Sequence, residues 1–359
     1  MNITPRFTLY PVLVVVLVLT ACWKAPIEEM ELIPIRFGSI AGASQTYIPK
    51  LMQEQGIGEK YGFDVEIFTL SGFGAQWAGL RTGDFDISSG SALDLLRQRQ
   101  AGLEVRAIRA FITFGNPIVT LADAPYDKLS DLTGVLVGTP STALLDWMII
   151  RAAGLRGDGF DIEKETEPVN ASPALITELL ERGEIDAAFQ FSDFTLGPIA
   201  EGTLKQITSV PELMEEAGFD PDSFYLTYNL ADSWREQYPK AVPLLVAAMD
   251  EAVGLMMTDD SIWPELAAFS GMENEDLLPL FIEKQRNSFS TNFSREKLEP
   301  TQELFDSLVE VVGEEPVGVT FVDPEAFDFD SVEDAQNLRF SEGKWFVYYP
   351  TSAGSGQRE

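Results

Sequence analysis

Cys22 is the only cysteine of this 359-residue chain, and its surroundings predict covalent attachment of a lipid. It follows Leu19, Thr20 and Ala21, a pattern that resembles a bacterial lipobox. The small side chains would let a peptidase approach the bond, and the thiol would take a diacylglycerol before cleavage. A lone cysteine also excludes an internal disulfide. We therefore expect lipidation at Cys22, the alternative being an ordinary cleaved signal with a chance cysteine.

The segment before Cys22 predicts export. Arg6 precedes an apolar run, residues 7–19, which is shorter than the roughly 20 residues that a membrane-spanning helix needs. It matches the hydrophobic region of a secretory signal. We expect residues 1–21 to be a lipoprotein signal peptide and 22–31 a tether. The mature protein would then lie outside the cytoplasm, anchored by its lipid to an envelope membrane.

Histidine is absent from the sequence, which removes the usual base of Ser-His-Asp and Cys-His hydrolysis and the commonest zinc ligand. The chain carries 57 acidic against 25 basic residues, for a net charge of −32. Such a charge opposes binding to nucleic acid, because the phosphates would be repelled. We expect a binding protein rather than an enzyme, with no metal or cofactor.

Three polar loops could hydrogen-bond a small ligand: 71–74 (SGFG), 88–91 (SSGS) and 139–142 (TPST). We expect each at the start of a helix, where backbone N–H groups are free and partial negative charge is favoured. The alternative is that Ser91 and Ser141 are only helix caps and that the glycines only serve turns.

The predicted ligand-facing segments lack cationic side chains. No Lys or Arg occurs in 38–49, 71–80, 88–93, 111–119, 138–145 or 189–200, whereas aromatic residues are common there. Asp193 could accept a hydrogen bond from an amino group, or else cap a helix over 193–200. The pattern favours a neutral or weakly cationic planar ligand over a simple oxyanion.

The order of elements predicts an α/β fold with mostly parallel, doubly wound sheets. Strand patterns occupy 32–38, 63–70, 85–88, 105–112, 135–138, 165–169, 185–189 and 224–230, with helical patterns between them. Helical segments dominate from 234 to 312, and the tail from 313 is rich in turns, with its last residues expected to be disordered. Chain crossings near 113–118 and 221–227 would join two lobes.

The chain resembles substrate-binding proteins of nitrate, sulfonate and taurine ABC importers, a group that includes thiamine-precursor binders. The resemblance lies in IRFGSIAGASQTYIPKLMQEQG, SGFGAQWAGLRTGDFDISSGS, KLSDLTGVLVGTPSTALLDWMIIRAAGL, LLERGEIDAAFQFSDF and SWREQYPKAVPLLVAAMDEAV. It implies a bilobal periplasmic-binding-protein fold with a two-segment hinge, and a helical C-terminal part on the first lobe. Lobe 1 would comprise 32–115 and 223–312, lobe 2 would comprise 116–222, and 313–359 would be an extension.

The resemblance and the loop chemistry together give a set of candidate ligand contacts. They are Ser39, Ala43, Gly72, Phe73, Gln76, Ser89, Ser91, Phe114, Thr139, Ser141, Thr142, Gln190, Asp193 and Tyr228. The expected partners are a small solute, an ABC permease and its ATPase, and the membrane through Cys22, with the protein itself a monomer. The favoured ligand is a thiamine pyrimidine precursor or a flavin-like heterocycle, and a sulfonate, taurine or nitrate is the alternative.

Other functions fit the sequence less well. Eukaryotic thiamine-pyrimidine synthases resemble these binding proteins, but they consume a histidine and use a cysteine-rich motif, both of which this chain lacks. Paired-carboxylate glycosidase chemistry would need two acids together in a cleft, and no such pair is evident. A sensing module for a membrane receptor remains an alternative. The acidic tail from Asp323 to Asp334 lacks the spacing of a calcium loop.

Overall fold

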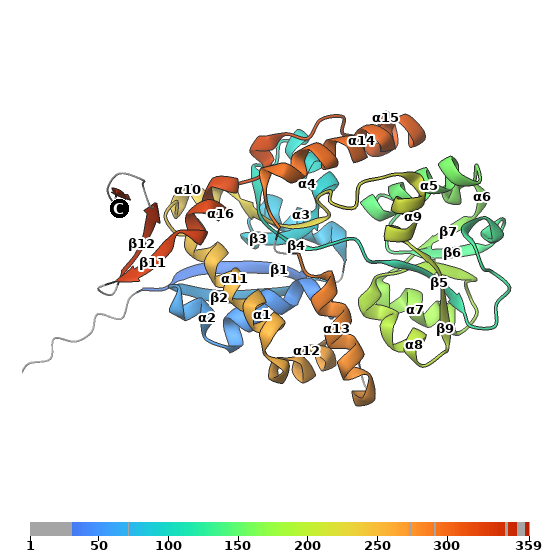
Figure 1. Ribbon diagram of the computed structural model, residues 1–359, viewed down its shortest axis with the longest axis horizontal. Coiled ribbons are helices and arrows are strands. Elements are labelled where there is room, and N and C mark those ends of the chain that lie inside the picture. The colour runs from blue at the N-terminus through green and yellow to red at the C-terminus, as the bar shows by residue number, and fades with distance from the viewer. Residues whose placement is uncertain are drawn as a thin grey trace, which may run out of the picture. The chain divides into compact units, whose positions relative to one another are not determined.

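Two five-stranded sheets organise the chain in the computed structural model (Figure 1). The structure describes residues 31–70, 72–272, 274–290, 292–341, 344–349 and 356–358. Cys22, the signal segment 1–21, all but the last residue of the tether, and Ser71 lie outside the described residues. None of the helices in those ranges is both long enough and apolar enough to cross a bilayer.

The first sheet has the strand order β2-β1-β3-β10-β4. Its strands are β1 (Ile33–Ile40), β2 (Phe63–Leu70), β3 (Ile87–Ser91), β4 (Val105–Ile112) and β10 (Leu226–Ala231). β1 is parallel to β2 and β3, whereas β10 runs antiparallel to β3 and β4. β10 is the strand that returns to this sheet after the second lobe, so the sheet is mixed rather than uniformly parallel.

The second sheet has the order β7-β6-β8-β5-β9. Its strands are β5 (Pro117–Leu121), β6 (Leu136–Thr139), β7 (Glu167–Asn170), β8 (Ala187–Phe189) and β9 (Leu204–Ser209). β6 pairs in parallel with β7 and β8, and β5 is antiparallel to β8 and β9. The sequence patterns did not predict β5 or β9. The chain passes between the sheets at 113–116 and again at 218–225.

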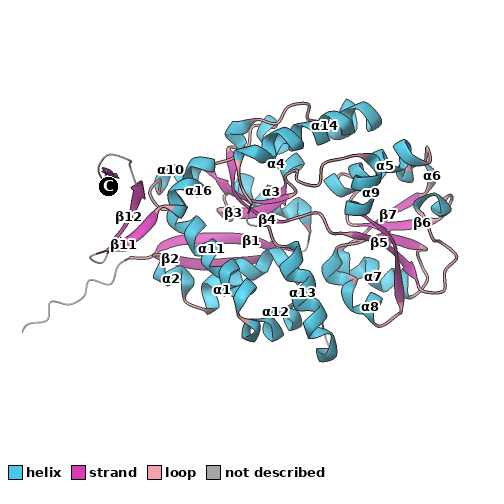
Figure 2. Cartoon of the chain, in the orientation of Figure 1, coloured by secondary structure: helices cyan, strands magenta, loops and turns pink. Residues whose placement is uncertain are grey.

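Helices cover the faces of both sheets (Figure 2). Those associated with the first sheet are α1 (Tyr47–Glu54), α2 (Ile57–Lys60), α3 (Phe73–Thr82), α4 (Ala92–Gln100), α10 (Asp232–Gln237) and α11 (Val242–Thr258). Those of the second are α5 (Leu145–Gly157), α6 (Ile162–Glu165), α7 (Pro173–Glu181), α8 (Leu196–Ala200) and α9 (Val210–Ala217). Tryptophan, tyrosine and phenylalanine side chains fill much of the core between helices and sheets, including the fully buried Trp147, Trp263 and Tyr47.

The C-terminal third is helical, as predicted as far as residue 312, whereas the two helices after that residue lie in the tail that was expected to be rich in turns. It contains α12 (Trp263–Phe269), α13 (Leu278–Ser288), α14 (Leu298–Val312), α15 (Glu314–Val317) and α16 (Phe329–Gln336). α14 lies against α5 of the second lobe, whereas α16 packs on α11 and β4. Short 3-10 turns complete the chain, namely η1 (Ser44–Thr46), η2 (Leu129–Leu132), η3 (Ser192–Phe194), η4 (Asp260–Ile262), η5 (Glu275–Leu277), η6 (Arg295–Lys297) and η7 (Pro324–Ala326).

Two predictions about local structure are wrong. The loop 139–142 does not open a helix, because α5 begins only at Leu145, with Leu144 at its N-cap position. The tail also forms a small antiparallel sheet of β11 (Leu338–Ser341), β12 (Lys344–Tyr349) and β13 (Gly356–Arg358). Residues of β13 were expected to be disordered, but cross-strand pairing orders short polar strands that lack a local signal of their own.

Candidate functional site

A cavity of about 80 Å³ lies where the loops after β1, β3 and β8 meet the start of α5. Ligands of open α/β sheets bind at such carboxyl edges of strands. The lining residues come from both lobes and are Ala43, Ser44, Gln45, Gln76, Trp77, Ser89, Gly90, Ser91, Asp94, Phe111, Ile112, Thr113, Gly115, Asn116, Leu144, Asp146, Phe191, Ser192, Asp193, Tyr225, Leu226 and Ser288. This lining includes three carboxylates and four aromatic rings, and no Lys or Arg.

Asp146 is a buried carboxylate in the first turn of α5, with 2% of its surface exposed. Its Oδ1 accepts hydrogen bonds from Asn116 Nδ2 (3.1 Å) and Tyr225 Oη (3.0 Å), which come from the two chain crossings. Burial raises the pKa of Asp146 to about 6, although these two hydrogen bonds oppose the shift. Asp146 therefore ties the second lobe to both crossings at the edge of the cavity.

A buried amide group faces the cavity from the first lobe. Gln45 Oε1 accepts hydrogen bonds from Gln76 Nε2 (3.0 Å) and from the Ser89 hydroxyl. Tyr228 Oη donates to the Gln45 carbonyl oxygen at 2.5 Å, which fixes the backbone. The Gln45 Nε2 atom is buried and has no hydrogen-bond partner among the described residues. An unsatisfied buried donor is costly, so this atom is positioned for an acceptor that the protein does not supply.

Asp193, in η3 of the second lobe, contacts the first lobe directly. Its Oδ2 accepts from the Ser44 backbone N–H (3.1 Å), and its Oδ1 accepts from Gln285 Nε2 of α13 (2.6 Å). Burial raises the pKa of Asp193, and these two hydrogen bonds oppose the shift. The predicted helix cap is therefore not its role. Asp193 joins the two lobes across the cavity.

Asp94 is the one acid of the cavity with a cationic neighbour among the described residues. Its Oδ2 accepts from the Ser91 hydroxyl (2.8 Å), and its Oδ1 lies 3.3 Å from Arg97 Nη1. Burial raises the pKa of Asp94, with Ser91 and Arg97 opposing the shift. Ser91 also caps α4 by accepting from the Asp94 backbone N–H (3.1 Å), which is the alternative role that the sequence left open for it.

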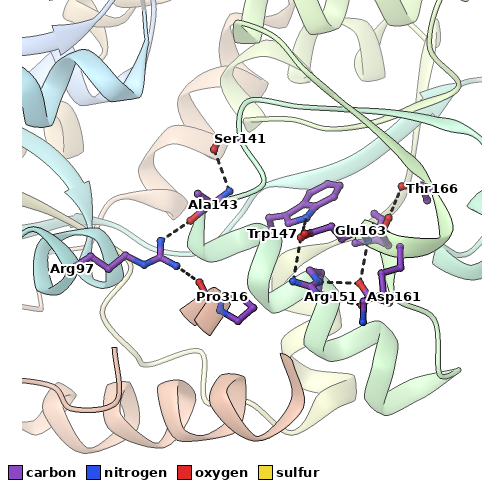
Figure 3. A network of polar contacts seen from close by, with 11 residues as sticks. Arg97, Ser141, Ala143, Trp147, Arg151, Asp161, Glu163, Thr166 and Pro316 are labelled. Atoms are coloured by element: carbon purple, nitrogen blue, oxygen red, sulfur yellow. Dashed lines mark hydrogen bonds and ion pairs between the residues drawn. The ribbon is translucent and has the colours of Figure 1, made fainter. Parts of the chain in front are cut away.

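Arg97 connects α4 to two distant parts of the chain (Figure 3). Its guanidinium donates to the carbonyl oxygens of Ala143 (2.8 Å), Pro316 (2.7 Å) and Val317 (2.9 Å). Ala143 lies in the loop before α5, and its N–H is held by the Ser141 hydroxyl at 3.1 Å. One side chain thus joins the first lobe, the second lobe and α15.

α5 is held in place by a buried ion pair further along the helix (Figure 3). Arg151 Nε and Nη2 donate to the two oxygens of Asp161, at 2.9 and 3.0 Å. Trp147 Nε1 donates to Glu163 at 3.2 Å. The paired geometry of a guanidinium and a carboxylate restricts both side chains. The anchor therefore fixes the helix whose first turn carries Asp146.

The structure brings together only part of the predicted set of contacts. Ala43, Gln76, Ser89, Ser91 and Asp193 line the cavity. Ser39 and Thr139 are buried in their strands, Gly72 caps α3, and Phe73 begins that helix. Ser141 and Thr142 lie in the turn before α5.

Three further predicted contacts point elsewhere. Gln190 Nε2 donates to the Pro173 carbonyl (2.6 Å) inside the second lobe, so its side chain turns away from the cavity. Tyr228 is buried beneath Gln45. Phe114 stacks on Tyr225 with ring centroids 4.4 Å apart and lines a neighbouring cavity instead.

The principal residues missed from the sequence are Gln45, Asn116 and Asp146. Asp146 had a usable signal, because it is a single acid inside the apolar run LLDWMII. An acid in such a run must be buried or must interrupt the helix face. Asn116 lies in a connecting segment and Gln45 in the short 3-10 turn η1, and nothing in the local sequence distinguishes them.

The described residues contain no group of three or more metal-ligating side chains. Comparison with known proteins gives the chain's relatives. Residues 53–222 match the family described as ABC transporter, phosphonate, periplasmic substrate-binding protein. A protein of Brucella abortus (strain 2308) whose name describes a binding protein is 26% identical over 224 residues. That alignment covers 61% of this chain and 66% of the relative, just under two thirds of its length.

Solved structures share the fold. The alkanesulfonate-binding protein SsuA of Xanthomonas axonopodis pv. citri, bound to MOPS, has a TM-score of 0.67 at 14% identity, covering 83% of this chain and 99% of its own. The nitrate-binding protein NrtA of Synechocystis PCC 6803 has a TM-score of 0.60 at 14% identity, covering 85% and 88%. These relatives are binding proteins rather than enzymes, in agreement with the prediction. The family match over residues 53–222 and the common bilobal fold make the chain similar to periplasmic substrate-binding proteins of ABC importers.

Proposed function

We propose that this chain is a lipid-anchored binding protein that delivers a small, neutral or weakly cationic heteroaromatic molecule to an ABC permease and its ATPase. The observation that carries the proposal is the chemistry of the cavity. Its described lining holds Asp94, Asp146 and Asp193 beside Trp77 and Phe191, and no cationic side chain. Aromatic rings suit a planar ligand, and carboxylates accept hydrogen bonds from its N–H groups.

An oxyanion is the second candidate, because the structural relatives include an alkanesulfonate-binding and a nitrate-binding protein. Such a ligand would have to rely on backbone N–H groups at the cavity. It would also lie close to buried carboxylates, two of which form no ion pair among the described residues, namely Asp146 and Asp193. Like charges in a poorly solvated site repel strongly, so this chemistry favours the heteroaromatic ligand.

A thermal-shift panel tests the ligand class. Thiamine pyrimidines, flavins, taurine, alkanesulfonates, alkylphosphonates and nitrate would each be added to the mature protein. A ligand at one hundred times its dissociation constant stabilises the folded state by about 2.7 kcal/mol. We expect a shift with a heterocycle. A shift with an oxyanion and with no heterocycle would favour the second candidate.

The lipid anchor is tested separately. Labelling with radioactive palmitate should mark the wild-type protein, and Cys22→Ser should lose the label and leave the signal unprocessed. One diacylglycerol together with an N-acyl chain is enough for stable membrane attachment. Release of the wild-type protein as an unacylated species cleaved at another site would contradict the anchor.

A further inference from the structure

The two faces of the cavity differ in chemistry, and the difference restricts the ligand further. On one face Asp146 is a carboxylate that lacks a cation. Among the described residues it forms no ion pair, and its two side-chain donors, Asn116 and Tyr225, both reach Oδ1. No described side chain donates to Oδ2. A buried carboxylate without a counter-ion is unfavourable, and a cation bound beside it removes the cost.

The second face is formed by Gln45, which is 6% exposed. The Gln45 Oε1 atom accepts hydrogen bonds from Gln76 Nε2 and from the Ser89 hydroxyl, which leaves the amide nitrogen of Gln45 as the free end of the side chain. The remaining group, Nε2, is therefore a donor, and it is buried without a partner among the described residues. This observation is independent of the acids, and it calls for a hydrogen-bond acceptor on the ligand.

Resting on the function proposed above, we propose that Asp146 is the counter-ion for a protonated nitrogen of the ligand, and that Gln45 Nε2 donates to an acceptor atom on the same molecule. The ligand class is then a small organic cation with a flat body and a neutral acceptor, such as a heterocycle carrying an amine. Trp77, Phe111 and Phe191 border the same space and suit the face of such a ring.

The size of the cavity adds a mechanical requirement. It measures about 80 Å³, roughly half the 150 Å³ of a cavity known to hold benzene. A ring needs more room than this cavity provides, so we expect the lobes to move apart to admit it. The Asp193 bridge to Ser44 and Gln285, which spans the lobes, must break for this to happen.

Matched probes show separately how the charge and the aromatic ring of a ligand affect its affinity. Benzylammonium, benzenesulfonate and phenylphosphonate share a phenyl group and differ in charge, and their affinities can be measured by calorimetry. We expect benzylammonium to bind and both anions to fail. Asp146→Asn keeps an oxygen for Asn116 and Tyr225 but removes the charge, so it should weaken benzylammonium binding on the order of 100-fold.

Asp158→Asn is the matched control for charge, because it lies at the other end of α5, is well exposed and changes the net charge equally. It should leave the affinity unchanged. Thermal unfolding of each variant shows that it is folded. Binding of either anion more tightly than benzylammonium, an absence of any binding by the cation, or an equal affinity in Asp146→Asn would each overturn the proposal.

A second pair of probes tests Gln45. 3-(Aminomethyl)pyridine in its ammonium form has the shape of benzylammonium but adds a ring nitrogen that accepts a hydrogen bond. We expect it to bind the wild type about tenfold more tightly, as one buried hydrogen bond allows. Gln45→Glu keeps the oxygen that accepts from Gln76 and Ser89 but removes the Nε2 donor, so the advantage of the pyridine should disappear. A persistent advantage would overturn the role of Gln45.

The outcomes also separate this inference from the function on which it rests. If an oxyanion binds and scattering shows that the lobes close around it, the chain remains an importer-type binding protein and only the assigned charge is wrong. If no member of the wider panel stabilises the protein, the proposed ligand class itself fails.

Discussion

Single side chains set the charge preference of the cavity, and Asp146 is the most informative of them. Its carboxylate is 2% exposed and is hydrogen-bonded by Asn116 and Tyr225 rather than by a cation. Burial raises its pKa to about 6, and the nearby charge of Asp94 adds to the shift. The arrangement is a strained one for the free protein at neutral pH. It becomes favourable when a positive group of the ligand lies beside it.

The cost of burying the Asp146 charge without a counter-ion predicts how Asp146→Asn alters the stability of the folded protein. In the folded state the pKa of Asp146 is about 6, against 3.8 for the ordinary group, so the folded protein holds the proton more tightly. The stabilisation of the folded state by the proton on Asp146 is complete below about pH 4, and it is lost as the pH rises through 6. Without ligand, the variant should therefore be more stable than the wild type at pH 7.5 by about 2–3 kcal/mol. Urea titrations at pH 4 and pH 7.5 measure this, and an equal difference at both values would contradict it.

Protonation of Asp146 should also control the binding of a cationic ligand. When Asp146 takes a proton, the counter-ion is lost, so the affinity for benzylammonium should fall as the pH drops through about 6. Arg97 faces Asp94 and not Asp146, and Tyr225 stays neutral because burial raises its pKa well above the usual value. Calorimetry between pH 5 and 8 measures this affinity. Benzylammonium is a suitable probe because it keeps its own positive charge over that pH range. An affinity that is constant, or that rises at low pH, would argue against the role of Asp146.

At the scale of elements, close packing of helix α3 on the first sheet positions Gln76, which lies on that helix. Gly38 on β1 and Gly79 on α3 lie against the ring of Phe85, and a Cβ at Gly79 would come 2.1 Å from that ring. The two glycines are needed for this approach. Gly254 in α11 is different, since a Cβ there would meet nothing within 4 Å.

Gly79 and Gly254 give a paired prediction. Gly79→Ala should destabilise the protein by about 1–3 kcal/mol, because the ring of Phe85 must move. Gly254→Ala should stabilise it by about 0.5–1 kcal/mol, because alanine loses less backbone freedom in a helix. Chemical denaturation compares them directly. Equal effects of the two substitutions would show that packing against Phe85 is not the constraint.

The elements also show what the sequence could and could not predict. The strands over 63–70 and 105–112 have strong periodicity, and the structure places them with those bounds. β5 was missed because it begins with Pro117 and is only five residues long. The start of α5 was predicted too early, because Thr139 and Ser141 resemble helix caps although Leu144 takes that position.

The site was less predictable than the fold for a physical reason. Strand pairing and contacts between the lobes decide which residues face a cavity. Neither leaves a pattern in the local sequence. Gln190 was expected to contact the ligand, yet its amide donates hydrogen bonds within its own lobe. The lack of Lys and Arg at the carboxyl edges was readable from the sequence, and the described lining has none.

At the scale of the whole binding unit, Asp193 and Arg97 make two of the polar bridges between the lobes. Asp193 reaches Ser44 and Gln285, and Arg97 reaches the loop of Ala143 together with α15. Hinge motions between lobes use short connecting segments, which here are 113–116 and 218–225.

Removing one bridge should favour separation of the lobes. Asp193→Ala leaves Ser44 N–H and Gln285 Nε2 without their acceptor, so the variant should show a larger radius of gyration than the wild type in small-angle X-ray scattering. Asp158→Asn, which is remote from the bridges, serves as the control and should match the wild type. Identical scattering from all three proteins would show that the Asp193 bridge does not hold the lobes together.

Native mass spectrometry of protein purified from its own envelope tests most directly what the cavity holds. We predict a single small molecule bound one to one, which on release proves to be an organic cation with a heteroaromatic ring. It should be present in the wild type and in Asp158→Asn, and it should be absent from Asp146→Asn. A sulfonate, a phosphonate or nitrate in the wild-type protein, or the same molecule retained by Asp146→Asn, would contradict the assignment of this site.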